Sequence, residues 1–586
     1  MSLQVKLHAL RIDHSTSTTT TTTTRRKTKR SRVSSKSSKL RSTTARVDEP
    51  ALPVAANVVT QEADNALVPL LQLPSELLLA IIHEYVAICR RRTQKRLAGR
   101  FYTWIKVTHV CRHLRAVAIA DPTLWNMVNV VQPDFLQELL VRSQQTPLTY
   151  EIGHIAQSDA ALQSVGLMLE SLDRVAEFKY LYSSSHFGKF PEIGASAPLL
   201  RSLTVHNAEQ IHPRGATVKA PRFFSDCELP SLEKLDVALL PYSSIQSMFR
   251  PTLKSLTIST CTIPGIASVL LDALQDMPLL ETLKLHQVLP EHSTTRKEAS
   301  SPVVSLPHLR YLYLSRCGAT ECADFLDHLS FPSDTALHLD MRPCGRQLWC
   351  SLVIPALSAK FKDRAPVKTA YIHSPWNTDV QVAVWSKEMS MDEFESQGVT
   401  PDLCITMYGH HSGTVECDET LVSLTCDLPM SGVKTLCIGE LNHYLKRNSS
   451  WIAIFTPMTQ TETLGVSGSS VEFVSSVFHR PRERKLSSSG GGNVMANLKC
   501  LSLRKVTFKE DYEAAVYHYD YIHSLSTCLA IRNERHKKLE VLRIRLAVNL
   551  AEEDTHLLES VADRLDWDHE VHIQSLRKKF PDDVFG

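Results

Sequence analysis

Three residues with metal-ligand chemistry stand close together in this sequence. His109, Cys111 and His113 alternate, and the two histidines are four residues apart. On a helix, that spacing places both imidazoles on one face, where two nitrogens can share a zinc ion. The alternative is that these positions form the mixed surface and core of an amphipathic helix. We favour this second interpretation and expect no metal here.

A second group of such residues is looser. His410 and His411 lie near Cys404 and Cys417, but their spacing matches no standard metal motif. The sequence contains no GxSxG nucleophile motif, no phosphate-binding P-loop and no GxGxxG motif. The run Gly490-Gly491-Gly492 follows serines and is typical of a linker. The sequence therefore predicts a protein that is not an enzyme and holds no metal or cofactor.

Composition and length limit the class of protein. The chain has 586 residues, of which 43% are hydrophobic and 22% charged, as in globular proteins with more than one unit. No apolar run approaches the ~18 residues that a membrane-spanning helix needs, so we expect no membrane partner. The 14 cysteines are scattered without a CxxC pair. Such cysteines are typically small core residues of an intracellular protein.

Charge is distributed unevenly along the chain. Residues 1–47 hold twelve Lys or Arg and one acid, a net of +11, so a total of +3 leaves −8 for the rest. Residues 1–68 include a Thr run and few large apolar side chains, which predicts a disordered Thr/Ser-rich basic tail. An acidic body predicts no specific nucleic-acid partner, although a cationic arm would give salt-sensitive, non-specific attraction. Nucleic-acid binding is therefore our third hypothesis for function.

The tail contains one basic cluster with targeting potential. Its cations are typical of a nuclear-localisation signal, and a solvated basic tail explains them equally well. A mitochondrial presequence ranks third, because the segment has no amphipathic apolar face. We expect a cytoplasmic or nuclear protein, or one present in both compartments. The cluster consists of Arg25, Arg26, Lys27, Lys29, Arg30 and Arg32.

Two helices are expected after this tail. The first begins near Leu73, with Pro74 and Glu76 suited to its first turn. Its apolar face follows the helical period and comprises Leu77, Leu78, Ile81, Ile82, Tyr85 and Val86. A basic stretch, 90–100, separates it from the second helix. That helix is expected to end near Asp121-Pro122 and to have an apolar side of Val107, Val110, Cys111, Leu114, Val117 and Ala118.

A short motif then recurs along the chain. Each copy reads Pro-x-Leu-x-x-Leu-x-aliphatic, and its first leucines are separated by 32, 21, 27 and 29 residues. These spacings lie around the ~20–29 period of leucine-rich repeats. An alternating Leu-x-Leu strand buries one face only when neighbouring units stack beside it. Helical segments such as 266–276 and 321–329 are expected to cover the stack. The first leucines are Leu200, Leu232, Leu253, Leu280 and Leu309.

The remaining chain is expected to continue this pattern after an interruption. The motif fades over 346–430, which is expected to be a continuation of the repeats or an insertion whose strands the sequence pattern does not define. Within it, Asp379–Trp385 shows alternating apolar residues. The motif returns over 431–550. The last region, 551–586, is expected to form a C-terminal helix over 552–565 and a charged tail. The predicted fold class is α/β. A small all-helical module is expected over 69–130, and an irregular leucine-rich-repeat-like solenoid of parallel strands and helices follows, with its first part over 145–345.

The two helices carry a family resemblance. Leu73-Pro74-x-Glu76-Leu77-Leu78-x-x-Ile81 resembles the opening of an F-box, and Val107–Ala118 with Asp121-Pro122-Thr123-Leu124-Trp125 resembles its second half. The pattern is strongest in the form found in the F-box-like proteins of mushroom-forming fungi, and residues 302–312 resemble the repeat region of those proteins. Two positions depart from the pattern: Leu114 stands where many F-boxes have tryptophan, and 90–100 lengthens the link.

The resemblance implies a non-catalytic role in protein ubiquitination. An F-box docks on the adaptor subunit of an SCF-type (cullin–RING) ubiquitin ligase, and the repeats bind a protein substrate, which here is unknown. Partners would then be the adaptor subunit, the cullin and that substrate. Our alternative is a leucine-rich-repeat scaffold with no ligase role. The residues expected to contact the adaptor are Leu73, Pro74, Glu76, Leu77, Ile81, Val107, Val110, Leu114 and Trp125.

Overall fold

The computed structural model covers most of the chain after the basic tail. The basic cluster at 25–32, part of the link at 94–100, His410, His411 and the Gly-rich run at 490–492 lie outside the described residues. The described residues are 68–93, 101–153, 159–182, 196–207, 224, 227–261, 267–289, 303–341, 348–374, 379–390, 393, 399–408, 415–441, 448–478, 495–509 and 521–572.

The first described elements are helical. Helix α3 runs from Ser75 to Thr93, so it begins where the sequence indicates and continues beyond Val86. The predicted second helix is instead two pieces, a 3-10 helix η3 (Thr103–His109) and α4 (Arg112–Ala120). Cys111 between them is extended and accepts the Leu114 amide on its sulfur, which caps α4 and ends the continuous helix expected there. Short 3-10 turns are η1 (Pro69–Gln72) and η4 (Pro122–Leu124).

A 17-stranded sheet occupies most of the remaining chain. Its first nine strands pair in parallel and in the order of the sequence. They are β1 (Met127–Asn129), β2 (Leu148–Ile152), β3 (Val175–Tyr182), β4 (Ser202–Asn207), β5 (Lys234–Ala238), β6 (Ser255–Ser259), β7 (Thr282–His286), β9 (Tyr311–Cys317) and β11 (Ala336–Met341).

The sheet continues through a local reversal. β11 pairs with β14, and the spatial order is then β14, β13, β12, with β13 antiparallel to both neighbours. Parallel pairing resumes from β12 to β15 and continues to β20. These strands are β12 (Thr369–His373), β13 (Asp379–Trp385), β14 (Leu403–Tyr408), β15 (Thr435–Ile438), β16 (Thr463–Ser467), β17 (Cys500–Arg504), β18 (Leu539–Arg545) and β20 (Ala562–Trp567).

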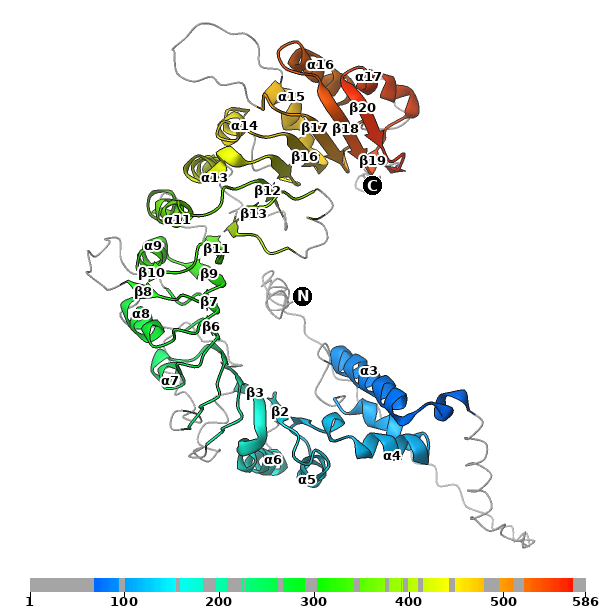
Figure 1. Cartoon of the computed structure of the whole chain (residues 1–586), viewed down its shortest axis with the longest axis vertical. Helices are drawn as coiled ribbons and strands as arrows, with labels where there is room; N and C mark the ends of the chain where they lie inside the picture. Colours follow the sequence, from blue (N-terminus) through cyan, green and yellow to red (C-terminus); the bar gives the residue numbers. More distant parts are fainter. Residues whose placement is uncertain are drawn as a thin grey trace, which may run out of the picture. The chain divides into compact units, whose positions relative to one another are not determined.

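Helices alternate with the strands, and those from α7 to α14 line one face of the sheet (Figure 1). The α-helices are α5 (Pro133–Arg142), α6 (Asp159–Glu170), α7 (Tyr242–Gln246), α8 (Ala267–Gln275), α9 (Ala319–Asp327), α11 (Ile354–Phe361), α13 (Val415–Asp427), α14 (Asn448–Phe455), α15 (Glu472–Phe478), α16 (Tyr521–Asn533) and α17 (Thr555–Glu559). Short turns are η5 (Leu172–Arg174), η7 (Trp349–Val353, a π-type turn), η8 (Met430–Gly432), η9 (Gly468–Val471) and η10 (Glu552–Asp554), and two small parallel pairs join β8 (Val304–Ser305) to β10 (Leu329–Ser330) and β19 (Ala547–Val548) to β21 (Val571–His572).

The recurring leucines form the core of this repeat region. The second leucine of each motif lies opposite its counterpart on the next strand, so one row of buried side chains crosses the strands. Each such side chain stabilises the fold by roughly 1.5–3 kcal/mol relative to exposure. The sequence prediction of stacked parallel strands is confirmed as a mixed α/β, solenoid-like fold. The row is Leu203, Leu235, Leu256, Leu283 and Leu312, and Leu337 of β11 extends it.

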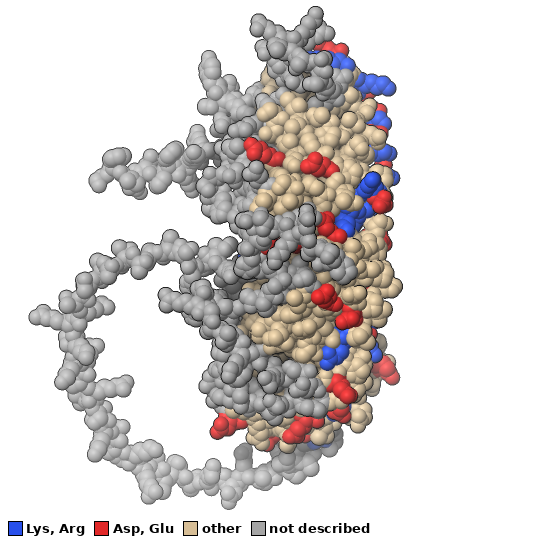
Figure 2. Space-filling view, turned by 90° about the vertical axis from the view of Figure 1, so that its left-hand side faces the viewer, with Lys and Arg blue, Asp and Glu red and all other residues tan. Residues whose placement is uncertain are grey.

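One margin of the sheet carries a row of alternating charges, which we call the charge ladder. Eight of its nine members immediately precede a strand, and Glu540 is the second residue of β18. Within each run, the amide of every later member donates to the carbonyl of the member before it. Ion pairs join Glu233 to Lys254 at 3.1 Å and Glu462 to Lys499 at 2.8 Å. Viewed from the helix side, residues of both charges follow one margin of the molecule (Figure 2). The ladder runs Arg201, Glu233, Lys254, Glu281 and Arg310 in the first half, then Lys434, Glu462, Lys499 and Glu540.

Two segments depart from the sequence predictions in instructive ways. The motif fades over 346–430 because β13 reverses there, so this stretch contains a three-stranded meander in place of a strand–helix unit. The helix expected over 552–565 ends at Glu559, and Ala562–Trp567 forms β20 instead. β20 pairs with β18 over five residue pairs. The predicted helix is therefore wrong in its second half, because pairing with the sheet outweighs local helical preference.

Candidate functional site

Helix α3 has two apolar stripes, only one of which lies in the core. Leu78, Ile82 and Val86 are buried and pack toward the other helices. Leu77, Ile81 and Tyr85 come one residue earlier in each turn, and 51%, 47% and 39% of their surface stays exposed. A helix that solvates its outer face normally places polar side chains there. This second stripe is therefore a candidate contact surface for another molecule.

The break between η3 and α4 provides the facing wall. Val110 lies at this break and is 68% exposed, the second largest value among the large apolar residues that remain exposed in the described chain. The backbone amide of Val110 donates to the carbonyl oxygen of Val107 at 3.3 Å, which closes η3 and directs the chain into the Cys111 cap. Val110 therefore belongs to neither η3 nor α4. The break between them keeps this apolar side chain at the surface.

These two walls enclose an apolar groove of about 290 Å³. Ile81 and Tyr85 contribute from α3, and Val107 and Val110 from the η3 segment. Lys106 is its one charged lining residue, and it is exposed. The groove can therefore bind an apolar side chain or helix face, with a cation at the rim. Its full lining is Leu70, Leu78, Ile81, Ile82, Tyr85, Lys106, Val107, Val110 and Leu114.

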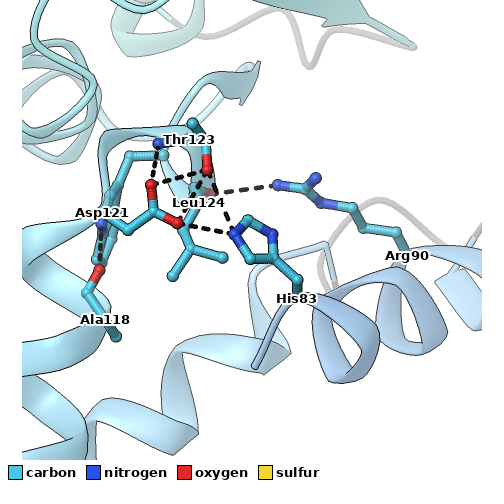
Figure 3. A network of polar contacts seen from close by, with 7 residues as sticks. His83, Arg90, Ala118, Asp121, Thr123 and Leu124 are labelled. Carbon is cyan, nitrogen blue, oxygen red and sulfur yellow. Dashed lines mark hydrogen bonds and ion pairs between the residues drawn. The ribbon is translucent and has the colours of Figure 1, made fainter. Parts of the chain in front are cut away.

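A polar network fixes α3 against the end of α4 (Figure 3). His83 of α3 lies 2.7 Å from a carboxylate oxygen of Asp121, and Thr123 donates through both its amide and its hydroxyl to the same carboxylate. Further along α3, Arg90 donates to the carbonyl of Leu124 at 3.3 Å. Burial alone would raise the pKa of Asp121, but the hydrogen bonds from Thr123 and His83 lower it below its usual value. The network therefore holds α3 against the segment that follows α4.

Trp125 fixes the same region from inside. It is fully buried, its ring centre lies 5.0 Å from that of Trp104, and its Nε1 donates to the Ala118 carbonyl at 2.9 Å. The Arg142 guanidinium of α5 lies over its ring at 4.5 Å. Because α5 belongs to the first strand–helix unit, Trp125 connects the helical module to the repeat region. It does not line the groove.

The residues expected to bind a partner thus have different environments. Ile81 and Val110 line the groove and are exposed, and Leu77 continues the α3 stripe. Val107 is half-buried in the groove, and Leu114 is buried at its base. The others lie outside the groove lining, with Leu73 half-buried, Pro74 and Glu76 exposed at the start of α3, and Trp125 in the core. Sequence reasoning missed five lining residues, which are Leu70, Leu78, Ile82, Tyr85 and Lys106. The four-residue step from Ile81 was the available signal for Tyr85.

A second polar cluster lies within the sheet, on strands β9, β11 and β14. The buried carboxylate of Asp340 accepts from the Tyr313 hydroxyl at 2.6 Å and the Ser315 hydroxyl at 2.9 Å, and it pairs with His338 at 3.1 Å. Burial would raise the pKa of Asp340, but these contacts lower it to about 2. Burial would lower the pKa of His338, whereas Asp340 and Cys404 raise it to about 10. The pair is therefore ionised near neutral pH.

Within the described ranges, the chain offers no metal site and no membrane-spanning helix. No group of three or more metal-ligating side chains is found among the described residues, and His109 and His113 lie on separate helical pieces. Among those same residues, no helix is both long and apolar enough to cross a membrane. No protein-family model and no curated protein matches the chain. The groove is accordingly the candidate site that the geometry supports best.

Proposed function

We propose that this chain is an F-box-type substrate-recognition adaptor of an SCF-type (cullin–RING) ubiquitin ligase. The observation that carries the proposal is the exposed stripe of Leu77, Ile81 and Tyr85 facing Val110 across an apolar groove. The groove belongs to a small helical module directly followed by a repeat sheet. The F-box resemblance of Leu73–Ile81 and Asp121–Trp125 supports the same assignment.

In this proposal, the groove side of the module docks on the ligase's adaptor subunit, and the leucine-rich-repeat-like region binds a protein target. The chain itself forms and breaks no bond. Holding a target beside a charged ubiquitin-conjugating enzyme raises the effective concentration of its lysines, which is sufficient to direct transfer. Trp125 and the Asp121 network would act by positioning, because they join the two regions without lining the groove.

The expected contribution of the stripe follows from its exposure. Complete burial of a Leu or Ile side chain stabilises by roughly 2 kcal/mol. About half of Leu77 and Ile81 remains exposed, so covering either one is worth about 1 kcal/mol. Placing an aspartate there adds the cost of burying a carboxylate without a partner. We therefore expect Leu77→Asp with Ile81→Asp to weaken docking by at least about 100-fold.

The test is a titration of the purified full chain with the ligase's adaptor subunit, followed by recruitment of the cullin. The matched control is Val141→Asp, which places the same charge at an apolar residue that is 71% exposed on α5, away from the groove. Circular dichroism must show that both variants keep their helices. Wild-type chain that fails to bind the adaptor would refute the ligase role and make a repeat-protein scaffold the leading hypothesis.

The compartment stays a separate prediction. The basic cluster from Arg25 to Arg32 is proposed to support nuclear import, and it lies outside the described residues. Fusion of residues 1–47 to a fluorescent reporter tests this directly. Nuclear accumulation that disappears when the six cations are replaced by glutamine supports the signal, and a purely cytosolic reporter refutes it.

A further inference from the structure

One basic residue lines the groove, and further basic residues are exposed at the start of α4, beside the lining residues Val110 and Leu114 in the sequence. Lys106 lines the groove, and Arg112, His113 and Arg115 are exposed within one turn of Leu114. No ion pair of Lys106 or Arg115 is found within the described part of the chain. Cations that keep their charge uncompensated beside an apolar surface attract an anionic partner.

The opposite wall offers little compensation. Glu84 of α3 is held by Arg91 at 2.6 Å, which neutralises its charge. Glu76 lies in the first turn of α3, where the helix dipole favours a carboxylate. Across residues 69–125, nine Lys or Arg stand against three Asp or Glu, a net of +6, whereas residues 126–586 hold 44 against 54, a net of −10. The positive charge is thus specific to the helical module.

This charge disfavours two occupants that the chain itself could supply, its N-terminal arm and a second copy in a symmetric dimer. The N-terminal arm carries +11 over residues 1–47, so it would bring cations to these basic residues. A second copy would, in a symmetric dimer, place Lys106 and Arg115 of one groove near the same residues of the other. Like charges facing each other disfavour both arrangements. The occupant that the groove fits is therefore a separate, acidic molecule.

We propose that the groove selects an acidic amphipathic helix on its partner. The inference deepens the proposed function, because it names the chemistry of the docking element. Apolar side chains at i, i+3 or i+4, and i+7 would enter between Ile81, Tyr85 and Val110, as helices do in apolar grooves. Glutamates or aspartates flanking that stripe would face Lys106 and Arg115. The apolar contacts supply most of the affinity, and the charges supply association rate and selectivity.

The test uses two synthetic helices of about 18 residues with identical leucine positions, one flanked by glutamate and the other by lysine. Each is titrated by fluorescence anisotropy against the full chain. We expect the acidic helix to bind about tenfold more tightly at 50 mM salt, and the difference to shrink below about threefold at 0.5 M, where screening is short-ranged. Lys106→Glu with Arg115→Glu should reverse the preference, whereas Lys362→Glu, an exposed site on the repeat region, should leave it unchanged.

Val110→Asp should remove binding of both helices, which locates them in the groove. Equal binding of the two helices, preference for the basic one, or binding of neither would overturn the inference. If the adaptor subunit still binds in that case, the proposed function stands without it. If the acidic helix binds while the adaptor does not, the selectivity of the groove stands and the ligase role fails.

Discussion

Trp125 offers the clearest separation between a packing role and a contact role. Its side chain is fully buried against Trp104, donates to the Ala118 carbonyl and lies under Arg142. Trp125→Ala should therefore loosen the module itself before it affects any partner. Replacing a buried Trp by Ala typically costs about 3–5 kcal/mol, because the transfer energy is lost and a cavity remains. The loss of the 2.9 Å hydrogen bond leaves the Ala118 carbonyl unpaired as well.

Hydrogen exchange followed by mass spectrometry measures this locally. If the module opens as a unit, 3–5 kcal/mol corresponds to amides of α3 and α4 exchanging roughly 10²- to 4 × 10³-fold faster. Strands β15 to β18 serve as the internal reference and should keep their rates. Trp125→Phe retains a ring against Trp104 but loses the donor, so it should show a smaller change. Unchanged exchange in Trp125→Ala, together with weaker adaptor binding, would refute the packing role.

Three further perturbations test other parts of the molecule. Because the folded protein lowers the pKa of Asp121, its carboxylate stabilises α3 above the ordinary aspartate range, and this stabilisation is lost as pH falls through the folded pKa. Asp121→Asn should therefore make the stability of α3 less dependent on pH in the acid range. Amide exchange rates of α3 measured over a pH series test this. Asp340→Asn should destabilise the sheet by about 3 kcal/mol in urea unfolding, because it removes one partner of a buried ion pair and burial then lowers the pKa of His338, so that the imidazole loses its proton. The wild-type pair should stabilise the folded state most between about pH 4 and 6.5. The pKa of His338 is raised, so its contribution to stability is lost as pH rises toward 10. The pKa of Asp340 is lowered, so its contribution is lost as pH falls toward 2. Lys499→Glu places an acid between Glu462 and Glu540 and should lower the Tm more than Lys499→Gln, with the difference disappearing at high salt.

Repeat spacing was the most informative signal in the sequence. Each strand predicted from a Leu-x-Leu motif is present, because burial on one face and stacking with identical neighbours act together on those residues. The left-handed turns after these strands were not predictable. Leu239, Thr260 and Gln287 adopt φ of 54–60°, with no glycine or asparagine to indicate it. Hydrogen bonds from the backbone amides of these residues to carbonyls of the next strand, such as that from Thr260 to His286 at 2.7 Å, hold the left-handed conformation in place.

The candidate site was predictable in composition but not in exposure. Helical period places Leu77 and Leu78 on one apolar face, and only the packing of α4 decides that Leu78 is buried while Leu77 stays outside. The exposure of Val110 depends on the Cys111 cap, whose weak sulfur acceptor has no strong sequence signature. Trp125 was expected among the contact residues because it ends the F-box-like motif. Its role in joining α4 to α5 depends on tertiary contacts with Trp104 and Arg142.

The charge ladder has a consequence for how this array can grow. Its members alternate in sign from Arg201 to Arg310 and again from Lys434 to Glu540. Duplicating or deleting one unit within either run would place two like charges side by side, whereas adding or removing two adjacent units preserves the alternation. We therefore expect length variants of this array to tolerate paired units better than single ones. A row of surface charges would then act as a parity rule on the number of repeats.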